Sequence, residues 1–159
     1  MRASTLAKTA ATVFTAGAIG GLANRDMPSL WYLKLKKPSF QPPAQAFGIV
    51  WPALYADIAA VSAATLDHYN QTGHQDKAKA YNVALAANLV LNASWSWLFF
   101  NQHKLALSAI GAGALAVSSA DLTRRAVEAK GAGAAPLAAY PLWCAFATVL
   151  SSRIWWLNR

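Results

Sequence analysis

Aromatic rings and side-chain amides at helical spacing are the groups in this sequence best suited to binding chemistry. Residues three or four apart share one face of a helix, and the rings fall on three such faces. In chain order, these faces carry Trp51 and Tyr55, then Asn92, Trp95 and Phe99, then Trp143, Ala147 and Leu150. Flat rings converging from several helices would form a slot for a flat apolar ligand. Asn88 and Asn92 would supply orienting hydrogen bonds, or would instead bond one helix to another.

Tryptophan also gathers where a membrane meets water, so an interfacial belt is the competing interpretation. That role fits the aromatic residues in the first loop and near the end of the chain, namely Trp31, Tyr32, Trp155 and Trp156. It fits Trp51, Trp95 and Trp143 less well, because small or polar residues share their helix faces.

Chemistry that depends on a metal, a phosphate loop or an activated nucleophile has no motif here. The sequence contains no glycine-rich phosphate loop, no cluster of His and Cys ligands and no Ser–His–Asp set. His68, His74 and His103 all fall in predicted loops, where we expect them to be solvated. The single cysteine, Cys144, lies in an apolar run and is expected to pack there. We therefore predict no metal site and no required cofactor.

Asp57 is the residue least expected from its surroundings. It falls in the middle of an apolar segment, where a charge inside a membrane costs at least about 2.5 kcal/mol. Such an acid is either functional or a packing residue, protonated or paired with an arginine such as Arg153. Asp57 is six residues from Trp51 and so lies on a different helix face. We therefore favour a role between helices over a role in the ligand slot.

The composition indicates a membrane protein. The chain has 159 residues, enough for one domain, and 13% of them are charged while 56% are hydrophobic. Soluble domains have about 25% charged residues. The formal net charge is +8, but the basic residues lie in short clusters between apolar runs. Contact with anionic lipid headgroups explains that pattern, and no nucleic-acid-binding signature accompanies it.

Apolar segments of about 20 residues are long enough to span a membrane. We place five of them at approximately 5–22, 47–66, 80–100, 105–122 and 134–157. The first resembles a signal peptide in having Arg2 and Lys8 before its apolar run, but its Gly17 and Gly21 also form a GxxxG pair for helix packing. Short connections predict one all-α domain, an up-down bundle of five transmembrane helices. Lys and Arg divide seven against seven between the two sides, so orientation stays open.

The first long loop is expected to be structured. Prolines at positions 38, 42 and 43 fix φ and remove backbone donors, which makes a stiff connector ahead of the second helix. We expect this connector to act as a lid over a pocket. The predicted lid residues are Trp31, Lys37, Pro38 and Phe40, and the predicted ligand contacts from the same loop are Pro42 and Pro43.

A stripe of small residues marks one face of the third segment. Ala80, Ala84 and Asn88 follow one another at four-residue spacing. Small residues let helices approach closely in lipid. The stripe therefore predicts either contact within the bundle or the seam of a homodimer.

Five motifs follow one another along nearly the whole chain. They are Trp31-Tyr32 with Lys37-Pro38, Gln41–Pro43, Trp51–Tyr55 (WPALY), Asn92–Phe100 (NASWSWLFF) and Tyr140–Thr148 (YPLWCAFAT). In their order and spacing the chain resembles the translocator protein family, also called the tryptophan-rich sensory proteins.

The resemblance implies a five-helix membrane bundle, often dimeric, whose first loop folds over a pocket. It implies binding of porphyrins such as protoporphyrin IX and of synthetic isoquinoline carboxamides and benzodiazepines, and binding of cholesterol in animal members. The family's pocket residues correspond here to Trp51, Asn92, Trp95, Trp143, Ala147 and Leu150, with Pro42 and Pro43 in the lid. The tryptophan at position 51 is the one that the family associates with light-dependent porphyrin breakdown.

The chain departs from the family pattern at three places. Ser39 and Phe40 stand where a second tryptophan is common, and Ser151 follows Leu150 in place of an asparagine. No tyrosine lies between Leu150 and Arg153, so the cholesterol motif is absent and sterol transport is not expected. These features look more like a bacterial member, which implies an integral protein of the bacterial cell membrane.

A membrane receptor or sensor of tetrapyrroles is the function we favour from the sequence. The ligand ring would stack on the three helical tryptophans, and its propionates would face Lys34, Lys36 and Lys37. One alternative is an enzyme that degrades the porphyrin with light and oxygen through Trp51. The other is a transporter of porphyrin or sterol.

Overall fold

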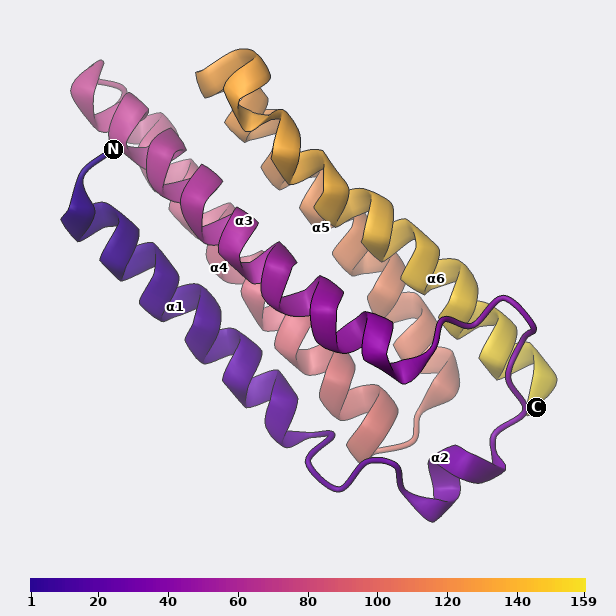
Figure 1. The fold of residues 1–159 in the computed structure, drawn as a ribbon. Coiled ribbons are helices and arrows are strands. Elements are labelled where there is room, and N and C mark those ends of the chain that lie inside the picture. Colours follow the sequence, from indigo (N-terminus) through magenta and orange to yellow (C-terminus); the bar gives the residue numbers. More distant parts are fainter.

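The computed structural model describes residues 1–159 and contains helices without strands. Five long helices run alternately up and down (Figure 1). They are α1 (Ala3–Leu22), α3 (Ala44–Gln71), α4 (Gln75–Ser96), α5 (Leu105–Lys130) and α6 (Ala139–Leu157). Three short elements complete the chain: α2 (Leu30–Lys34), the π-helical turn η1 (Trp97–Asn101) and the 3-10 helix η2 (Gly131–Ala138). The predicted all-α bundle is confirmed.

The helices extend further into polar sequence than the apolar runs suggested. The second helix was expected at 47–66 and occupies Ala44–Gln71, and the fourth was expected to end near residue 122 and reaches Lys130. Arg124 bonds both Asp121 and Glu128 one helical turn away on either side, which stabilises the polar end of α5. His68 accordingly lies in the last turn of α3, and its placement in a loop was wrong.

Three helical stretches are long and apolar enough to cross a membrane. They are Ala44–Gln71, Gln75–Asn101 and Leu105–Leu157, and the last contains α5 and α6. The first helix, α1, does not meet the same standard of hydropathy, although the sequence led us to count it as a span. Lys8 and several Ser and Thr residues lower its hydropathy. Even so, α1 packs along α3 and α4 as part of the bundle.

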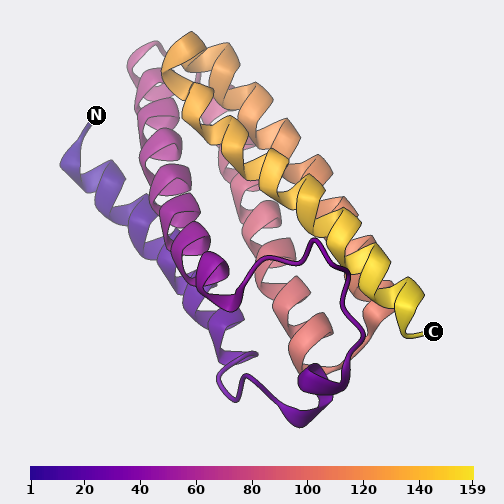
Figure 2. The same cartoon turned by 45° about the vertical axis from the view of Figure 1, so that its right-hand side comes forward.

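The helices pack in two groups around one core. α5 and α6 form the most extensive pair, while α1 lies against α3 and α4 (Figure 2). The core residues include Ile58 of α3, Tyr81 of α4, Leu122 of α5 and Tyr140 of α6, all essentially inaccessible to solvent. The bundle is thus tied together from the inside by side chains of four helices.

Asp67, near the end of α3, holds the beginning of α1. The backbone N–H of Arg2 and the hydroxyl of Thr5 both donate to its carboxylate, and the Arg2 guanidinium lies 3.6 Å away. Because α1 has no capping side chain or acid in its own first turn, Asp67 takes the place of an N-cap.

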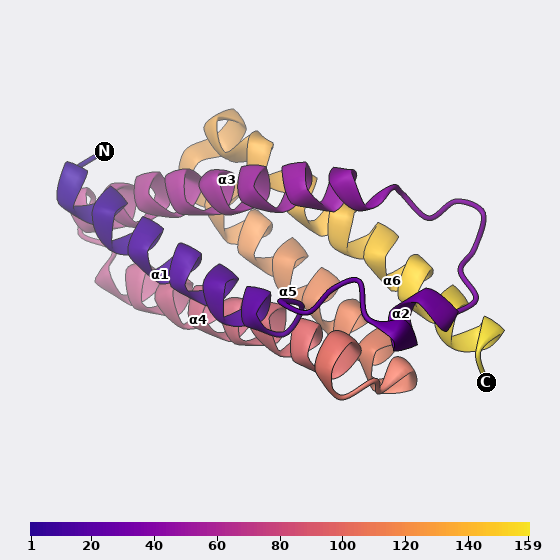
Figure 3. The ribbon, with the colours of Figure 1, turned by 60° about the horizontal axis from the view of Figure 1, so that its bottom comes forward.

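The segment between α1 and α3 covers the opposite end of the bundle. In Figure 3 it leaves α1, forms the short helix α2 and returns along the end of α6 to α3. We call residues 23–43 the lid. Its fastening is a pair of hydrogen bonds between Asn158 and the backbone of Lys36: the Lys36 N–H donates to Asn158 Oδ1 over 2.9 Å, and Asn158 Nδ2 donates to the Lys36 carbonyl over 2.8 Å.

Candidate functional site: an aromatic cavity beneath the lid

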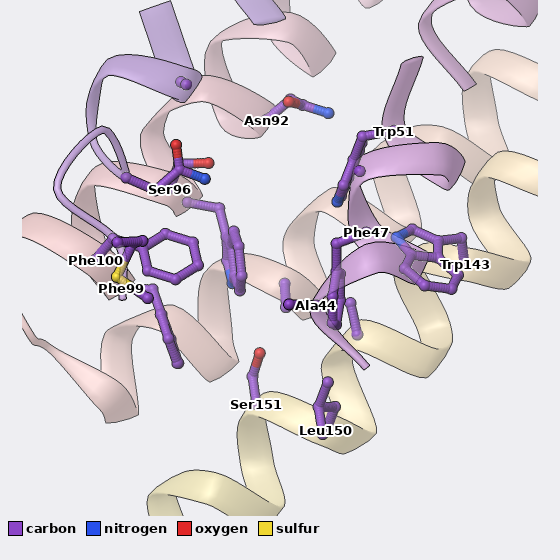
Figure 4. A pocket seen from close by; sticks show the side chains of 18 of the residues that line it. Ala44, Phe47, Trp51, Asn92, Ser96, Phe99, Phe100, Trp143, Leu150 and Ser151 are labelled. Atoms are coloured by element: carbon purple, nitrogen blue, oxygen red, sulfur yellow. The ribbon is translucent and has the colours of Figure 1, made fainter. Parts of the chain in front are cut away.

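A cavity of about 560 Å³ lies inside the bundle on the side of the lid. All five long helices and the lid contribute to its wall. Figure 4 shows Phe47 and Trp51 of α3 across this space from Phe99 and Phe100, with Trp143 of α6 beside Phe47. Of the residues that the sequence pointed to, those that line the cavity are Trp51, Tyr55, Asn92, Trp95, Phe99, Trp143, Ala147 and Leu150. Their contact with a ligand stays a prediction.

Two groups of rings form the walls. On one side the Trp51 ring lies 5.7 Å from Tyr55 and meets Trp143 edge to face, with centroids 6.5 Å apart at 88°. Phe47 packs on the same Trp143 at 5.7 Å. On the other side Trp95 and Phe99 are stacked, 5.3 Å apart at 16°. Rigid aromatic walls of this kind offer a large apolar contact area to a flat ligand.

The π-helical turn η1 presents the aromatic residues at the end of α4. The wider turn of a π-helix changes which side chains share a face. Here Phe99 is buried against Trp95, and Phe100 packs edge to face on the same Trp95 ring, 5.9 Å away at 89°. Both residues line the cavity, and only Phe99 was expected from regular helical spacing.

A chain of buried hydrogen bonds closes the inner end of the cavity. The Tyr55 hydroxyl donates to Asn92 Oδ1 over 3.1 Å, and Asn92 Nδ2 donates to the Tyr140 hydroxyl over 2.9 Å. The Tyr140 hydroxyl donates in turn to Asn88 Oδ1 over 2.7 Å. Asn88 Nδ2 continues the chain to Ser119 Oγ, 3.1 Å away on α5.

This network corrects the expected role of the two amides. Asn88 is fully buried and does not line the cavity, so it cannot orient a ligand there. Asn92 does line the cavity, but its oxygen and nitrogen are both engaged by tyrosines. Bonding between helices, the alternative for this pair, is confirmed.

Three polar atoms in the cavity wall have no partner. They are the indole nitrogens of Trp95 and Trp143 and the side-chain oxygen of Gln41, each buried. Buried donors without a partner are rare because each one costs about 1–3 kcal/mol. The site therefore holds two N–H donors and one acceptor that a bound molecule could satisfy.

No charged side chain lines this cavity. The lysines expected to face a carboxylate ligand are placed elsewhere. Lys37 donates to the backbone carbonyls of Tyr32 and Leu35 and lies 4.3 Å above the Tyr32 ring. Lys34 and Lys36 are exposed on the outside of the lid. None of the three lysines lines the cavity, so their contact with the propionates of a ligand stays a prediction for the outer side of the lid.

The lid also contacts the cavity through residues other than those predicted. Trp31, Lys37, Pro38, Phe40, Pro42 and Pro43 do not line the cavity, and Asn24, Met27, Pro28, Tyr32 and Gln41 do. The predicted aromatic residues form an outer layer instead. Trp31 stacks on His103 at 3.7 Å and 8°, so this histidine is packed against the lid and not simply solvated. Phe40 meets Phe146 of α6 edge to face at 6.3 Å.

Glycines of α1 complete the wall. A Cβ on Gly17 would lie 2.8 Å from the Tyr55 ring, whereas a Cβ on Gly21 would meet nothing within 4 Å. The two glycines therefore do not act as a GxxxG pair for close helix packing. Gly17 instead makes room for an aromatic ring of the site.

Phe47 lines the cavity but was not among the predicted site residues. Its spacing could have identified it, because Phe47 lies four residues before Trp51 on the same helix face.

Asp57 does not line the cavity, which agrees with the preference for a role outside the ligand slot. It is half-buried and forms no ion pair with the exposed Arg153, so the suggested pairing was wrong. The stripe of Ala80, Ala84 and Asn88 does not form one surface, because Ala80 is exposed while Asn88 is inside the bundle. Asn88 is therefore not available to a partner, and a homodimer contact through Ala80 and Ala84 stays a prediction.

Comparison with known proteins agrees with this architecture. The model of the TspO/MBR family matches residues 9–157. A membrane protein of Bacillus subtilis, YtaB, is 34% identical over 124 residues, which cover 78% of this chain and 77% of the relative. The tryptophan-rich protein TspO of Bacillus cereus is 33% identical over 128 residues, 80% of each chain. The human translocator protein is 27% identical over 125 residues, 79% of this chain and 73% of the relative.

These matches cover nearly all of the bundle and include bacterial relatives. Membership of such a family supports a role in a membrane as a sensor or receptor or as a transporter. The chain belongs to the TspO/MBR family.

Proposed function

We propose that this protein is a membrane receptor that binds a tetrapyrrole of the protoporphyrin class in the cavity beneath the lid, in a bacterial cell membrane. The observation that carries the proposal is a cavity of about 560 Å³ walled by aromatic rings from several helices. Its volume lies within the range of about 300–1,000 Å³ that is usual for small-molecule sites. Synthetic isoquinoline and benzodiazepine ligands, also flat and apolar, would compete for the same space.

The polar atoms of the wall suggest how such a ligand would be held. A macrocycle would lie between the Trp51–Trp143 wall and the Trp95–Phe99 wall. Acceptor groups on the ligand would receive hydrogen bonds from the unpartnered indole N–H groups of Trp95 and Trp143. Since no cation lines the cavity, the propionates would be stabilised best at the solvent side of the lid.

Quenching of tryptophan fluorescence by protoporphyrin IX in detergent tests the proposal. Trp143→Phe keeps an aromatic ring but removes one N–H donor, so we expect binding to weaken about tenfold, which corresponds to one hydrogen bond of about 1.4 kcal/mol. Trp156→Phe is the matched control, because that tryptophan is half-exposed outside the cavity. Equal affinities for the two variants and the unmodified protein would place the ligand elsewhere.

A second function, degradation of the bound porphyrin, is favoured by the position of Trp51. This indole lines the cavity and lies within 5.7 Å of Tyr55 and 6.5 Å of Trp143, so three oxidisable rings adjoin the ligand space. Here light would excite the porphyrin and oxygen would be the oxidant. Loss of porphyrin absorbance on illumination should need oxygen and should slow in Trp51→Phe. An unchanged rate in that variant would contradict this function while leaving binding intact.

Transport of the same ligand would use the cavity as a stage on a path across the membrane. Flux of porphyrin into liposomes separates this function from sensing. A receptor binds the ligand in liposomes without moving it, whereas a transporter gives flux that falls in Trp143→Phe.

A further inference from the structure

A second pocket, of about 450 Å³ and open to the surface, lies at the end of the bundle away from the lid. It is formed by the first turns of α1, the last turns of α3 and the beginning of α4, which come together near the N-terminus (Figure 1). Lys8 and three threonines line it on α1, Leu66 and Asn70 on α3, and Asn82 and Leu85 on α4. We call this space the N-terminal crevice. It shares no residue with the aromatic cavity and is independent of the function proposed above.

The N-terminal crevice offers donors to a ligand. The side chains of Lys8, Asn70 and Asn82 come from three different helices, and none of them forms a hydrogen bond or an ion pair within the chain. The three threonine hydroxyls already donate, to the Asp67 carboxylate and to the backbone carbonyls at positions 59 and 8. The available protons are therefore those of one ammonium group and two amides, a set that suits an oxyanion.

The charge of the crevice also favours an oxyanion. Lys8 is its single charged residue. Asp67, next to Leu66 of the crevice wall, is engaged by Arg2 and Thr5 and forms no ion pair with Lys8. A crevice with one positive charge and two amide donors matches the single negative charge of a phosphodiester.

The depth of the crevice in the bundle indicates that the phosphodiester belongs to a phospholipid headgroup. Lys8 lies five residues into α1 and Asn82 seven residues into α4, which at 1.5 Å per residue is about 8–10 Å from the helix ends. This depth corresponds to the level where headgroups meet hydrocarbon, since headgroup layers are about 5–8 Å thick. The buried side chains of Leu66 and Leu85 form its apolar floor, and farther along α4 the side chain of Val90 is exposed on the surface of the bundle.

We propose that the N-terminal crevice is a binding site for an anionic phospholipid. The headgroup phosphate pairs with Lys8 and accepts hydrogen bonds from Asn70 and Asn82, and the acyl chains run along the apolar surface of α4. A site between three helices would fasten the beginning of α1 to α3 and α4.

Thermal unfolding in detergent, with short-chain phosphatidylglycerol or phosphatidylcholine added, tests the site. Phosphatidylglycerol should raise the Tm more than phosphatidylcholine does, and Lys8→Gln should weaken phosphatidylglycerol binding about fivefold, because a basic residue near the headgroups contributes about 1 kcal/mol. Asn82→Ala should also weaken it. Lys77→Gln is the matched control, since Lys77 is an exposed cation at the same end of the bundle, outside the crevice.

The outcomes separate the site from general surface charge. A phosphatidylglycerol effect that disappears in Lys8→Gln and persists in Lys77→Gln supports the proposal. Equal losses in the two lysine variants, or equal stabilisation by the two lipids, would overturn it. Stabilisation by inorganic phosphate that matches phosphatidylglycerol would show that the crevice takes a free anion, which also overturns the assignment to a lipid.

Discussion

The fastening of the lid by Asn158 leads to the sharpest prediction. Its amide accepts from the Lys36 N–H and donates to the Lys36 carbonyl, so it bonds the lid backbone on both sides, and its nitrogen also donates to the Ile154 carbonyl over 2.7 Å. Asn158→Ala removes both bonds to the lid and adds no bulk. No other hydrogen bond in the structure joins the lid to α6.

The size of the effect follows from the two lost bonds. A neutral hydrogen bond contributes about 0.5–1.5 kcal/mol net, and these bonds are partly open to water, so about 1–2 kcal/mol for the pair is appropriate. If lid opening limits ligand release, dissociation should accelerate about 5- to 30-fold. The affinity should fall by a similar factor, since the rate of association changes less.

Two measurements check this prediction. Hydrogen exchange of the backbone in residues 29–43 should quicken in Asn158→Ala even without a ligand, and stopped-flow fluorescence should show faster release of protoporphyrin IX. Asn101→Ala is the control, because Asn101 is an exposed asparagine at the same end of the bundle with no side-chain hydrogen bond. Unchanged exchange in the lid of Asn158→Ala would refute the reasoning, whatever happens to the ligand.

Three further changes probe the bundle around the site, each followed by the Tm in detergent. Gly17→Ala should destabilise by about 1–3 kcal/mol, because the new Cβ lies 2.8 Å from an aromatic ring of α3, whereas Gly21→Ala should be neutral or stabilising. Tyr140→Phe should cost about 1–3 kcal/mol, because it leaves the oxygen of Asn88 buried without its donor; a neutral result would mean that water replaces the hydroxyl. Asp67→Asn should lower stability at neutral pH. The carboxamide has no negative charge beside Arg2 and keeps only one of the two acceptor oxygens used by Arg2 and Thr5.

Much of the fold could be predicted because membrane helices leave a strong signal. Apolar runs of spanning length located the long helices, and regular spacing placed Trp51 and Tyr55 on one face of the same cavity. The ends of the helices were less predictable. Ion pairs one turn apart, such as those of Arg124, prolong a helix after hydropathy has fallen.

Contacts between distant segments explain what the sequence did not reveal. Whether Asn88 faces the cavity or a neighbouring helix depends on where Tyr140, 52 residues later, places its hydroxyl. Lys37 has the same charge in any conformation, but the lid turns it onto the backbone at Tyr32. Gly17 has the spacing of a helix-packing residue, and its part in the site is visible only once Tyr55 lies opposite it.

The hydrogen-bond network from Tyr55 through Asn92, Tyr140 and Asn88 to Ser119 restricts which ligands can fit the cavity. Each hydroxyl and amide in this network already has a partner, so rotating one toward a ligand would leave its neighbour without that hydrogen bond inside the bundle. The inner end of the cavity is therefore a rigid wall that does not rearrange around a ligand. Discrimination between guests has to arise at the rim and the lid, where the chain can still adjust, and substitutions that broaden or narrow the range of ligands should map to those outer parts.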